Sequence, residues 1–402
     1  MQDKVYVGRL APSPTGNLHV GHAFTFYIAM KRRQKYGNKG KLIFRVEDLD
    51  HQRCKQRFVQ EMIEDLHWMG ITWDEGPGSE GQRSDVVHNI ETSSYFQSNR
   101  TELYQRALEL LIKNRFIYPS SHSRKEVNAE MERVLSMKER AGVIERMKRS
   151  YSNISTNDKE EIEIEKEITY LSAPNEGEEE APFPSSLRPQ AFQDMSSFHN
   201  CDNCDNTGDT NKDTDTLEEN PQFSNVNWRF RVPDDEIIVF YDGNFGEQKY
   251  VCGKDFGDFV CWTKGGFASY ELAVVVDDLA MGVTEVVRGG DLLLSTARQI
   301  LLRKALSECE KLEKEKDQIN NIEKICNKKL KTTNEKDENE CHDNDSVHYY
   351  HCDLIRDKKS GQRMAKRDNS TMLRSLRNQG WTPDRIKDTY FNVSENRRSI
   401  KL

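Results

Sequence analysis

The chain has 402 residues, enough for one large domain or two ordinary ones with a substantial core. Hydrophobic residues make up only 35% and charged residues 31%, so we expect part of the length to lie outside any core. No apolar run approaches the roughly 18 residues that cross a bilayer, which argues against an integral membrane protein. The net charge of −8 argues against non-specific binding of polyanions by the whole molecule.

The opening residues and the cysteines indicate the cellular compartment in which the protein resides. MQDKVYVGRL lacks the apolar stretch of a secretory signal and the Arg- and Ser-rich composition of a transit peptide. The nine cysteines are scattered, odd in number and without framework spacing, which favours reduced thiols. We therefore expect a cytoplasmic protein.

The first third of the chain has the periodicity of a parallel α/β fold. Strands are predicted at 4–11 and 41–49, and helices at 23–37 and 57–70, where each helix ends at a glycine. The order strand, helix, strand, helix is typical of a parallel sheet with crossover helices.

Two later stretches, 136–224 and 307–346, are charged or rich in Asn, Asp and Thr, apart from a short apolar island at 183–188. Such segments bury too little apolar area to offset the entropy of ordering, so we expect insertions that are partly disordered or loosely helical. Between the insertions the pattern predicts a helix at 291–306, preceded by strands at 228–233, 237–243, 258–263 and 269–278. After the second insertion come a strand, a basic loop and a helix.

The segment RLAPSPTGNLHVGH, residues 9–22, follows the first predicted strand directly. Its prolines and glycine predict a turn that brings a helix N-terminus, with unpaired backbone N–H groups, to the edge of the sheet. There His19 and His22 can donate hydrogen bonds to phosphate oxygens, and Gly21 allows a flat base to approach the backbone. A plain proline-rich connection with two incidental histidines would have the same pattern.

The segment GQRMAKRD, residues 361–368, combines cations and a glycine ahead of a helix. Such a loop can close over a triphosphate and offset the charge that develops on leaving pyrophosphate. A solvated basic turn is the alternative.

The first motif, R-x-A-P-S-P-T-G-x-L-H-x-G-H, together with the late R-M-A-K-R resembles the HIGH and KMSKS signatures of class I aminoacyl-tRNA synthetases. Three further segments narrow the resemblance to the glutamyl branch of this class: FRVEDLD, GITWDEGP and YELAVVVDDLAMGVTEVVRGGDLLLSTARQILL. The resemblance covers about 1–135, 225–306 and 347–390. It implies an α/β fold: a doubly wound parallel-sheet, Rossmann-like (HUP-type) catalytic domain with an inserted acceptor-binding-like subdomain.

The resemblance and the composition together predict how the chain is divided. We expect the first half of the catalytic domain at 1–135 and its second half at 225–306, with the low-complexity insertion 136–224 inside the inserted subdomain. The charged insertion 307–346 then precedes the KMSKS-like loop and a C-terminal helical segment at 347–402.

By resemblance, six residues match the glutamate-binding positions: Arg9, Ala11, Ser13, Glu47, Tyr270 and Arg288. A guanidinium group pairs with a carboxylate through two hydrogen bonds, so Arg9 and Arg288 are the candidates for the substrate carboxylates, and Glu47 for its ammonium group. An ordinary surface ion pair between Arg9 and Glu47, and a core position for Tyr270, are the alternatives.

The resemblance also implies ATP-binding residues, and it implies catalysis by three of them: His19, Gly21, His22, Arg363, Lys366 and Arg367 bind ATP, and His19, His22 and Lys366 are catalytic. Lys366 matches the second lysine of KMSKS, while Arg363 replaces the first lysine and Ala365 stands at the usual serine. We expect Mg²⁺ to accompany ATP, held mainly by phosphates and water.

The short relatives within this branch usually carry a small zinc site made by three cysteines and a tyrosine. Here Ser120 and His122 stand at the first pair of ligand positions, and Phe183 and Leu187 at the second. Because serine, phenylalanine and leucine are not ordinary zinc ligands, we expect no structural zinc. Cys201 and Cys204 form an isolated C-x-x-C, for which free thiols are favoured.

The acceptor follows from the resemblance and from chain length. About 35 residues follow Arg367, which we expect to be too few for the anticodon-binding region of glutamyl-tRNA synthetases. The short form resembles glutamyl-Q tRNA(Asp) synthetases, which attach glutamate to the queuosine base in the anticodon of tRNA(Asp). The expected partners are queuosine-containing tRNA(Asp), L-glutamate and ATP, with no membrane partner and a monomeric state. A basic groove of Arg363, Lys366, Arg367, Arg374 and Arg377 is expected to contact RNA phosphates.

Two other functions remain open at this point. One is a glutamyl-tRNA synthetase that charges the 3′ end of tRNA(Glu) with an anticodon domain supplied in trans. The other is a non-catalytic RNA-binding relative, against which the complete set of expected activation residues argues.

Overall fold

The computed structural model describes residues 5–79, 93–123, 125–134, 136–137, 183–189, 225–326, 347–355 and 371–391. The chain forms two compact units. Unit 1 comprises Met1–Asn114, Phe240–Glu247 and Phe267–Leu402, and unit 2 comprises Arg115–Val239 and Gln248–Gly266. The boundaries predicted from composition stay predictions, and most of 136–224 lies outside the described residues.

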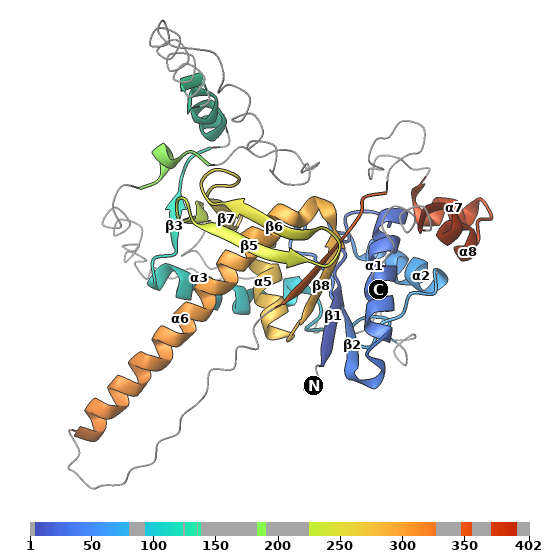
Figure 1. Cartoon of the computed structure of the whole chain (residues 1–402), viewed down its shortest axis with the longest axis horizontal. Helices are drawn as coiled ribbons and strands as arrows, with labels where there is room; N and C mark the ends of the chain where they lie inside the picture. The colour runs from blue at the N-terminus through green and yellow to red at the C-terminus, as the bar shows by residue number, and fades with distance from the viewer. Residues whose placement is uncertain are drawn as a thin grey trace, which may run out of the picture. The chain divides into compact units, whose positions relative to one another are not determined.

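Parallel strands form the centre of unit 1. Strand β1 (Tyr6–Leu10) pairs in parallel with β2 (Gly40–Phe44), and β8 (Glu285–Gly289) pairs in parallel with β9 (His348–Cys352). The backbone N–H of Thr284 donates to Val7 at 2.9 Å, which joins β1 to the start of β8. Figure 1 shows β1, β2 and β8 side by side. The predicted α/β fold with parallel strands is confirmed.

A hairpin extends this arrangement. Strand β5 (Ile237–Asp242) pairs in parallel with β9 at Asp242 and Tyr349, and β6 (Gly246–Val251) follows, giving the order β6-β5-β9-β8. Asp242 lies at the end of β5, where its carboxylate accepts the backbone N–H groups of Asn244 and Phe245 at 3.0 and 2.9 Å. The turn between β5 and β6 is therefore fixed by a buried carboxylate.

The helices of unit 1 pack around these strands: α1 (Val20–Gln34), α2 (Gln56–Trp68), α3 (Thr101–Lys113), α5 (Tyr270–Ala280), α6 (Leu293–Cys326), α7 (Leu373–Asn378) and α8 (Pro383–Ile386). Among the described residues, no helix is long and apolar enough to cross a bilayer. One continuous core contains Leu10, Phe24, Phe44, Leu66 and Leu373, so β1, α1, β2, α2 and α7 share a single apolar interior.

The predicted strand at 269–278 is wrong, because these residues form most of α5. Ser269 caps the helix by accepting the backbone N–H of Leu272 at 3.4 Å. Every residue from Glu271 to Asp278 is buried, so the segment has no polar face that would reveal a helical period. Its three consecutive valines favour a strand locally, and burial on all sides overrides that preference.

Helix α6 also differs from expectation, since it runs past 306 into the predicted insertion and ends at Cys326. Its extension packs on α3: the Sγ of Cys309 lies 3.6 Å from the carbonyl oxygen of Leu110, and Lys113 pairs with Glu313 at 2.6 Å. These contacts give the first turns beyond 306 a place in unit 1. Residues 327–346 lie outside the described part of the chain.

Unit 2 contains an antiparallel sheet of β3 (Ile117–Ser120), β4 (Asn227–Phe230) and β7 (Phe259–Trp262). Residues 183–189, which include the apolar island, are anchored beside it. Phe183 is buried, and Arg188 forms a fork on Asp258 with N–O distances of 2.8 and 2.7 Å. The same carboxylate also accepts hydrogen bonds from the hydroxyl of Tyr118 at 2.6 Å and from the backbone N–H of Val232 at 3.0 Å.

Candidate functional site

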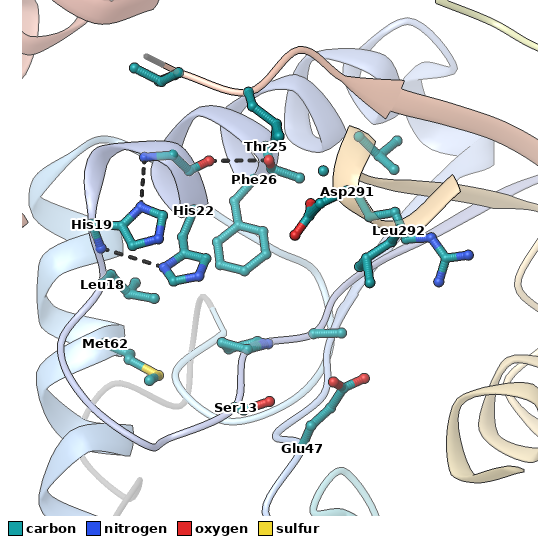
Figure 2. A pocket seen from close by; sticks show the side chains of 18 of the residues that line it. Ser13, Leu18, His19, His22, Thr25, Phe26, Glu47, Met62, Asp291 and Leu292 are labelled. Carbon is teal, nitrogen blue, oxygen red and sulfur yellow. Dashed lines mark hydrogen bonds between the residues drawn. The ribbon is translucent and has the colours of Figure 1, made fainter. Parts of the chain in front are cut away.

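A cavity of about 350 Å³ lies in unit 1, where β1 and β8 end and α1 begins. It falls within the size range of small-molecule sites. Nine residues that the sequence predicts for binding line it: Arg9, Ala11, Ser13, His19, Gly21, His22, Glu47, Tyr270 and Arg288. Figure 2 shows His19 and His22 on one side of the cavity and Glu47 across from them. The fold thus brings together residues that lie as much as 279 positions apart in the chain.

The other three predicted residues, Arg363, Lys366 and Arg367, lie outside the described residues, so their roles stay predictions. The described residues that flank this segment do reach the site. Leu354 and Ile355 line the cavity before it. After it, Met372 forms a β-bridge with His19, and the backbone N–H of Leu373 donates to Leu18 at 2.9 Å.

The two histidines form the N-terminal cap of α1. The Nδ1 atom of His19 accepts the backbone N–H of Gly21 at 3.0 Å, and the Nδ1 atom of His22 accepts the backbone N–H of His19 at 3.4 Å. Figure 2 shows both bonds and the stacked rings, whose centroids are 3.8 Å apart. Because Nδ1 is an acceptor in each neutral ring, the proton must sit on Nε2. The capping box therefore makes each histidine an Nε2–H donor.

Gly21 is required by this arrangement. A Cβ atom placed there would lie 2.8 Å from the Cε1 atom of His19, closer than real side chains approach. Glycine thus allows the His19 ring to fold over the first turn of α1. The close approach explains why glycine stands between the two histidines.

Arg288, from β8, is the most thoroughly held side chain in the cavity wall. It is 4% exposed, and its three nitrogens each donate to a neighbour. Nε donates to Nε2 of His351 at 3.2 Å, Nη1 to the hydroxyl of Tyr270 at 3.3 Å, and Nη2 to the hydroxyl of Thr296 at 2.7 Å. This side chain is a fixed cation facing the cavity, with its orientation set from three elements.

Glu47 supplies the opposite charge. It is 9% exposed and accepts a hydrogen bond from Arg45 at 3.2 Å. Arg45 is fully buried and also donates to Asp278 at 2.6 Å, and Asp278 lies 3.5 Å from Arg9. Burial raises the pKa of Glu47 by more than the guanidinium groups of Arg45 and Arg9 lower it. Arg9 and Glu47 are thus parts of a buried charge network, and the surface ion pair considered above is wrong.

Several residues of the site were not predicted from the sequence. Asp291, Thr25 and Phe26 line the cavity, and His351 and Thr296 hold Arg288 from behind. The spacing of Thr25 and Phe26, one turn along α1 from the histidines, is the signal that identifies them. His351 lies 63 residues from Arg288, and nothing local marks that pairing.

Arg374 and Arg377, predicted to contact RNA, have partners within unit 1. Arg374 pairs with Glu64 at 2.9 Å and Asp65 at 3.1 Å, and the guanidinium of Arg377 lies 5.5 Å from the ring centroid of Trp68. Both contacts attach α7 to α2. Arg374 therefore has a packing role that the sequence did not predict, and an RNA contact by either residue stays a prediction.

The predicted lack of structural zinc also stays a prediction. Ser120 lies 3.5 Å from Nδ1 of His122, and Phe183 is buried under the guanidinium of Arg229, 4.1 Å from its ring centroid. Within the described ranges, no three His, Cys, Asp or Glu side chains gather in a way that could hold a metal ion. Cys201 and Cys204 lie outside those ranges.

Comparison with known proteins identifies related chains. A family model described as "tRNA synthetases class I (E and Q), catalytic domain" matches residues 4–175 and 200–356. The glutamyl-Q tRNA(Asp) synthetase of Nitratidesulfovibrio vulgaris is 30% identical over 376 residues, covering 93% of this chain and 81% of that protein. The same enzyme of Symbiobacterium thermophilum is 33% identical over 300 residues, covering 74% and 70%.

Longer proteins match over a smaller share of their length. Glutamate–tRNA ligase 2 of Syntrophus aciditrophicus is 30% identical over 298 residues, which are 74% of this chain and 46% of that protein. Among solved structures, a glutamate tRNA ligase from Elizabethkingia meningosepticum in complex with its amino acid has a TM-score of 0.52 at 21% identity, covering 91% of this chain. This chain spans about half of that structure, 53% of its length, and the likeness bears on the fold.

Proposed function

The chain belongs to the family of class I tRNA synthetases for glutamate and glutamine, as a catalytic domain of that family, and from this membership we propose that it activates L-glutamate with ATP and transfers the glutamyl group to the queuosine base of tRNA(Asp). The observation that carries the proposal is the cavity itself. Two buried arginines, a buried glutamate and a helix N-terminus with two imidazole donors face one small volume.

The amino acid fits the charges of the cavity. Glutamate has two carboxylates and one ammonium group at neutral pH, and the wall offers Arg9 and Arg288 for the carboxylates and Glu47 for the ammonium group. Arg288 retains N–H groups toward the cavity because a guanidinium has five, and three are used by His351, Tyr270 and Thr296. Ala11 and Ser13 complete this end of the site on the segment after β1.

The nucleotide is expected to bind at the N-terminus of α1. The Nε2–H groups of His19 and His22 and the positive end of the helix dipole suit phosphate oxygens. A carboxylate oxygen of glutamate attacks the α-phosphorus, the bond to the β-phosphate oxygen breaks, and pyrophosphate leaves. The protein aligns two anions and offsets the charge that grows on the leaving group. We assign that task to the two histidines and Lys366, with Mg²⁺ held by phosphates and water.

The described residues on either side of 356–370 support the role of Lys366 and its neighbours Arg363 and Arg367. Ile355, before the segment, lines the cavity, and Met372, after it, forms a β-bridge with His19. The chain therefore enters and leaves this basic segment beside the cavity. The finer fold description, a doubly wound Rossmann-like domain with unit 2 as the inserted acceptor-binding-like subdomain, belongs to this proposal, as does a cytoplasmic monomer.

The choice of tRNA(Asp) is supported by the relatives that this chain covers over more than two thirds of their length, among which are the two glutamyl-Q tRNA(Asp) synthetases. The test uses labelled glutamate, ATP and a queuosine-containing anticodon-arm fragment of tRNA(Asp), which has no 3′ acceptor end. We expect label on this fragment and none on the matched fragment with guanine in place of queuosine. Labelling of the 3′ end of intact tRNA(Glu) instead would replace the proposal by a glutamyl-tRNA synthetase activity.

A further inference from the structure

Behind the cavity, a buried polar chain runs from the β5–β6 turn to Arg288. Asp242 and His351 are both fully buried, and Nδ1 of His351 lies 2.7 Å from Oδ2 of Asp242. On the other side of the ring, Nε2 lies 3.2 Å from Nε of Arg288 and 3.0 Å from the hydroxyl of Thr296. Neither Asp242 nor His351 lines the cavity.

The chemistry of these groups fixes where the imidazole proton sits. Arginine has only N–H donors, so Nε2 of His351 must be the acceptor in its bond with Nε of Arg288. The proton of a neutral ring is then on Nδ1, where it is donated to Asp242. A doubly protonated ring would place an N–H against the guanidinium, which would break this hydrogen bond and add a like-charge repulsion.

Asp242 is itself held in place. One oxygen accepts the backbone N–H groups of Asn244 and Phe245, and the other accepts the backbone N–H of His351 at 3.0 Å. The carboxylate therefore cannot turn away from the ring without losing backbone hydrogen bonds. The position of Arg288 is in this way tied through His351 to the rigid turn between β5 and β6.

We propose that His351 is a positioning residue for glutamate selection: as a neutral imidazole fixed by Asp242, it holds the guanidinium of Arg288 so that the remaining N–H groups face the substrate carboxylate. The inference rests on the proposed function for the identity of that carboxylate. The state of the ring rests on the structure alone.

The charged groups around His351 act in opposite directions. Burial and the guanidinium groups of Arg288, on β8, and Arg9, on β1, disfavour the imidazolium, while Asp242 favours it. Burial is the largest effect, and the pKa of His351 is lowered from its usual value. The neutral ring that the hydrogen-bond geometry requires is therefore also the form that the surroundings favour at neutral pH.

The kinetic test compares three variants of the full chain with the wild type in glutamate-dependent exchange of pyrophosphate into ATP. His351→Leu fills a similar volume without an acceptor, and we expect the KM for glutamate to rise at least about tenfold while the KM for ATP changes little. His351→Gln keeps an oxygen acceptor and should recover part of the loss. Tyr118→Phe, which removes a buried hydroxyl bonded to Asp258 in unit 2, is the control for stability and should leave both KM values unchanged.

A second readout does not need activity. In the wild-type chain labelled with ¹⁵N-histidine, the signal that His351→Gln removes should show, at neutral pH, a protonated Nδ1 and an unprotonated Nε2. A proton on Nε2, or a charged ring, would overturn the proposal whether or not the chain activates glutamate. An unchanged glutamate KM in a folded His351→Leu variant would also overturn it, and if that variant does not fold, the spectrum and His351→Gln decide. Absence of any glutamate-dependent exchange in the wild type would instead contradict the proposed function.

Discussion

Charged side chains in the cavity wall are almost withdrawn from water. Arg9 and Arg288 are each 4% exposed, and Glu47 is 9% exposed. Removing such groups from water costs several kcal/mol per ion unless partners compensate. Here Asp278 pairs with Arg9 and Arg45 pairs with Glu47, which offsets part of that cost, and Arg9 and Glu47 both still line the cavity.

Replacing Glu47 by glutamine removes the negative charge and keeps the shape. We expect the KM for glutamate in pyrophosphate exchange to rise at least about tenfold, because a hydrogen bond to a charged ammonium group contributes roughly 1.5–3 kcal/mol. Glu75→Gln is the matched control, since Glu75 pairs with Lys41 at 3.1 Å and lies outside the cavity. Equal KM values for the two variants would remove the ammonium-binding role.

The raised pKa of Glu47 leads to a pH dependence. Protonation removes the charge that we assign to the ammonium group, and it occurs at a higher pH than for an exposed carboxyl group, whose pKa is about 4.3. Steady-state kinetics should therefore show a glutamate KM that rises as pH falls toward the raised pKa, and a flatter profile in Glu47→Gln. The free energy of unfolding should rise over the same fall in pH, although glutamate binding weakens. The reason is that a carboxyl group whose pKa is raised by folding stabilises the fold more as it becomes protonated. A wild-type profile as flat as that of the variant would contradict the assignment.

The residues that face the cavity could be predicted from the sequence because they lie in recognisable motifs. Sequence motifs did not identify Arg45, Asp278, His351 and Thr296, although these hold the former in place. Their partners are up to 233 residues away, and a buried ion pair leaves no periodicity in either segment. The residues of the cavity wall can thus be predicted from sequence motifs, whereas the buried residues that position them are found only from the structure.

At the scale of elements, the two histidines that cap α1 are also the ones that we propose as donors to ATP. Each uses Nδ1 to cap the helix, which directs the Nε2–H to the other side of the ring. Neither residue is among the usual N-cap types, so the cap itself was not predictable from propensity.

Two substitutions at His19 separate capping from donation to ATP. His19→Ala should lower the free energy of unfolding by about 1 kcal/mol through loss of the cap, whereas His19→Asp should restore most of it, because aspartate caps helices well. Both should lower kcat for pyrophosphate exchange by about a hundredfold, since neither side chain has an N–H donor. Urea unfolding and exchange kinetics measure the two effects, and recovery of kcat in His19→Asp would show that the cap alone matters.

Helix α5 shows which kind of element could not be predicted from the sequence pattern. Its predicted strand failed because a fully buried segment has no polar face, while the amphipathic α2 was predicted to within two residues at each end, with buried Val59, Met62, Ile63 and Leu66 on one face. The parallel pairing of the strands did follow from the alternation of strands and helices, whereas their order in the sheet was not predicted.

In unit 2, Arg188 anchors residues 183–189 through its ion pair with the buried Asp258. Arg188→Met leaves the carboxylate of Asp258 buried with only part of its hydrogen bonds, so we expect a loss of about 3 kcal/mol in the free energy of unfolding, measured in urea. Arg133→Met, which breaks an exposed pair with Glu130, is the control and should change stability very little.

We also expect the chain to need no zinc, since Ser120, His122, Phe183 and Leu187 stand at the positions that the resemblance assigns to zinc ligands. Elemental analysis of the purified chain should find far less than one zinc per chain, and a chelator should not change its unfolding transition. A stoichiometric zinc whose removal destabilises the chain would show that metal ligands lie outside the described residues.

At the scale of the whole molecule, the two compact units differ in how much of the proposed function they explain. Unit 1 contains the cavity and every described residue to which we give a role in activation. The long charged stretches were visible in composition, but composition does not reveal what such stretches do, and most of their residues lie outside the described ranges. The transfer step therefore rests on relatives, and the activation step rests on the geometry of unit 1.

The measurement that tests the account most directly is exchange of labelled pyrophosphate into ATP by the wild-type chain, with no tRNA present and with glutamate, glutamine or aspartate as the amino acid. A cavity with two fixed arginines and one glutamate predicts exchange with glutamate, and at least about tenfold less with glutamine, which lacks the second carboxylate, or with aspartate, which is one methylene shorter. Exchange that is absent with glutamate, or as fast with glutamine, would contradict it.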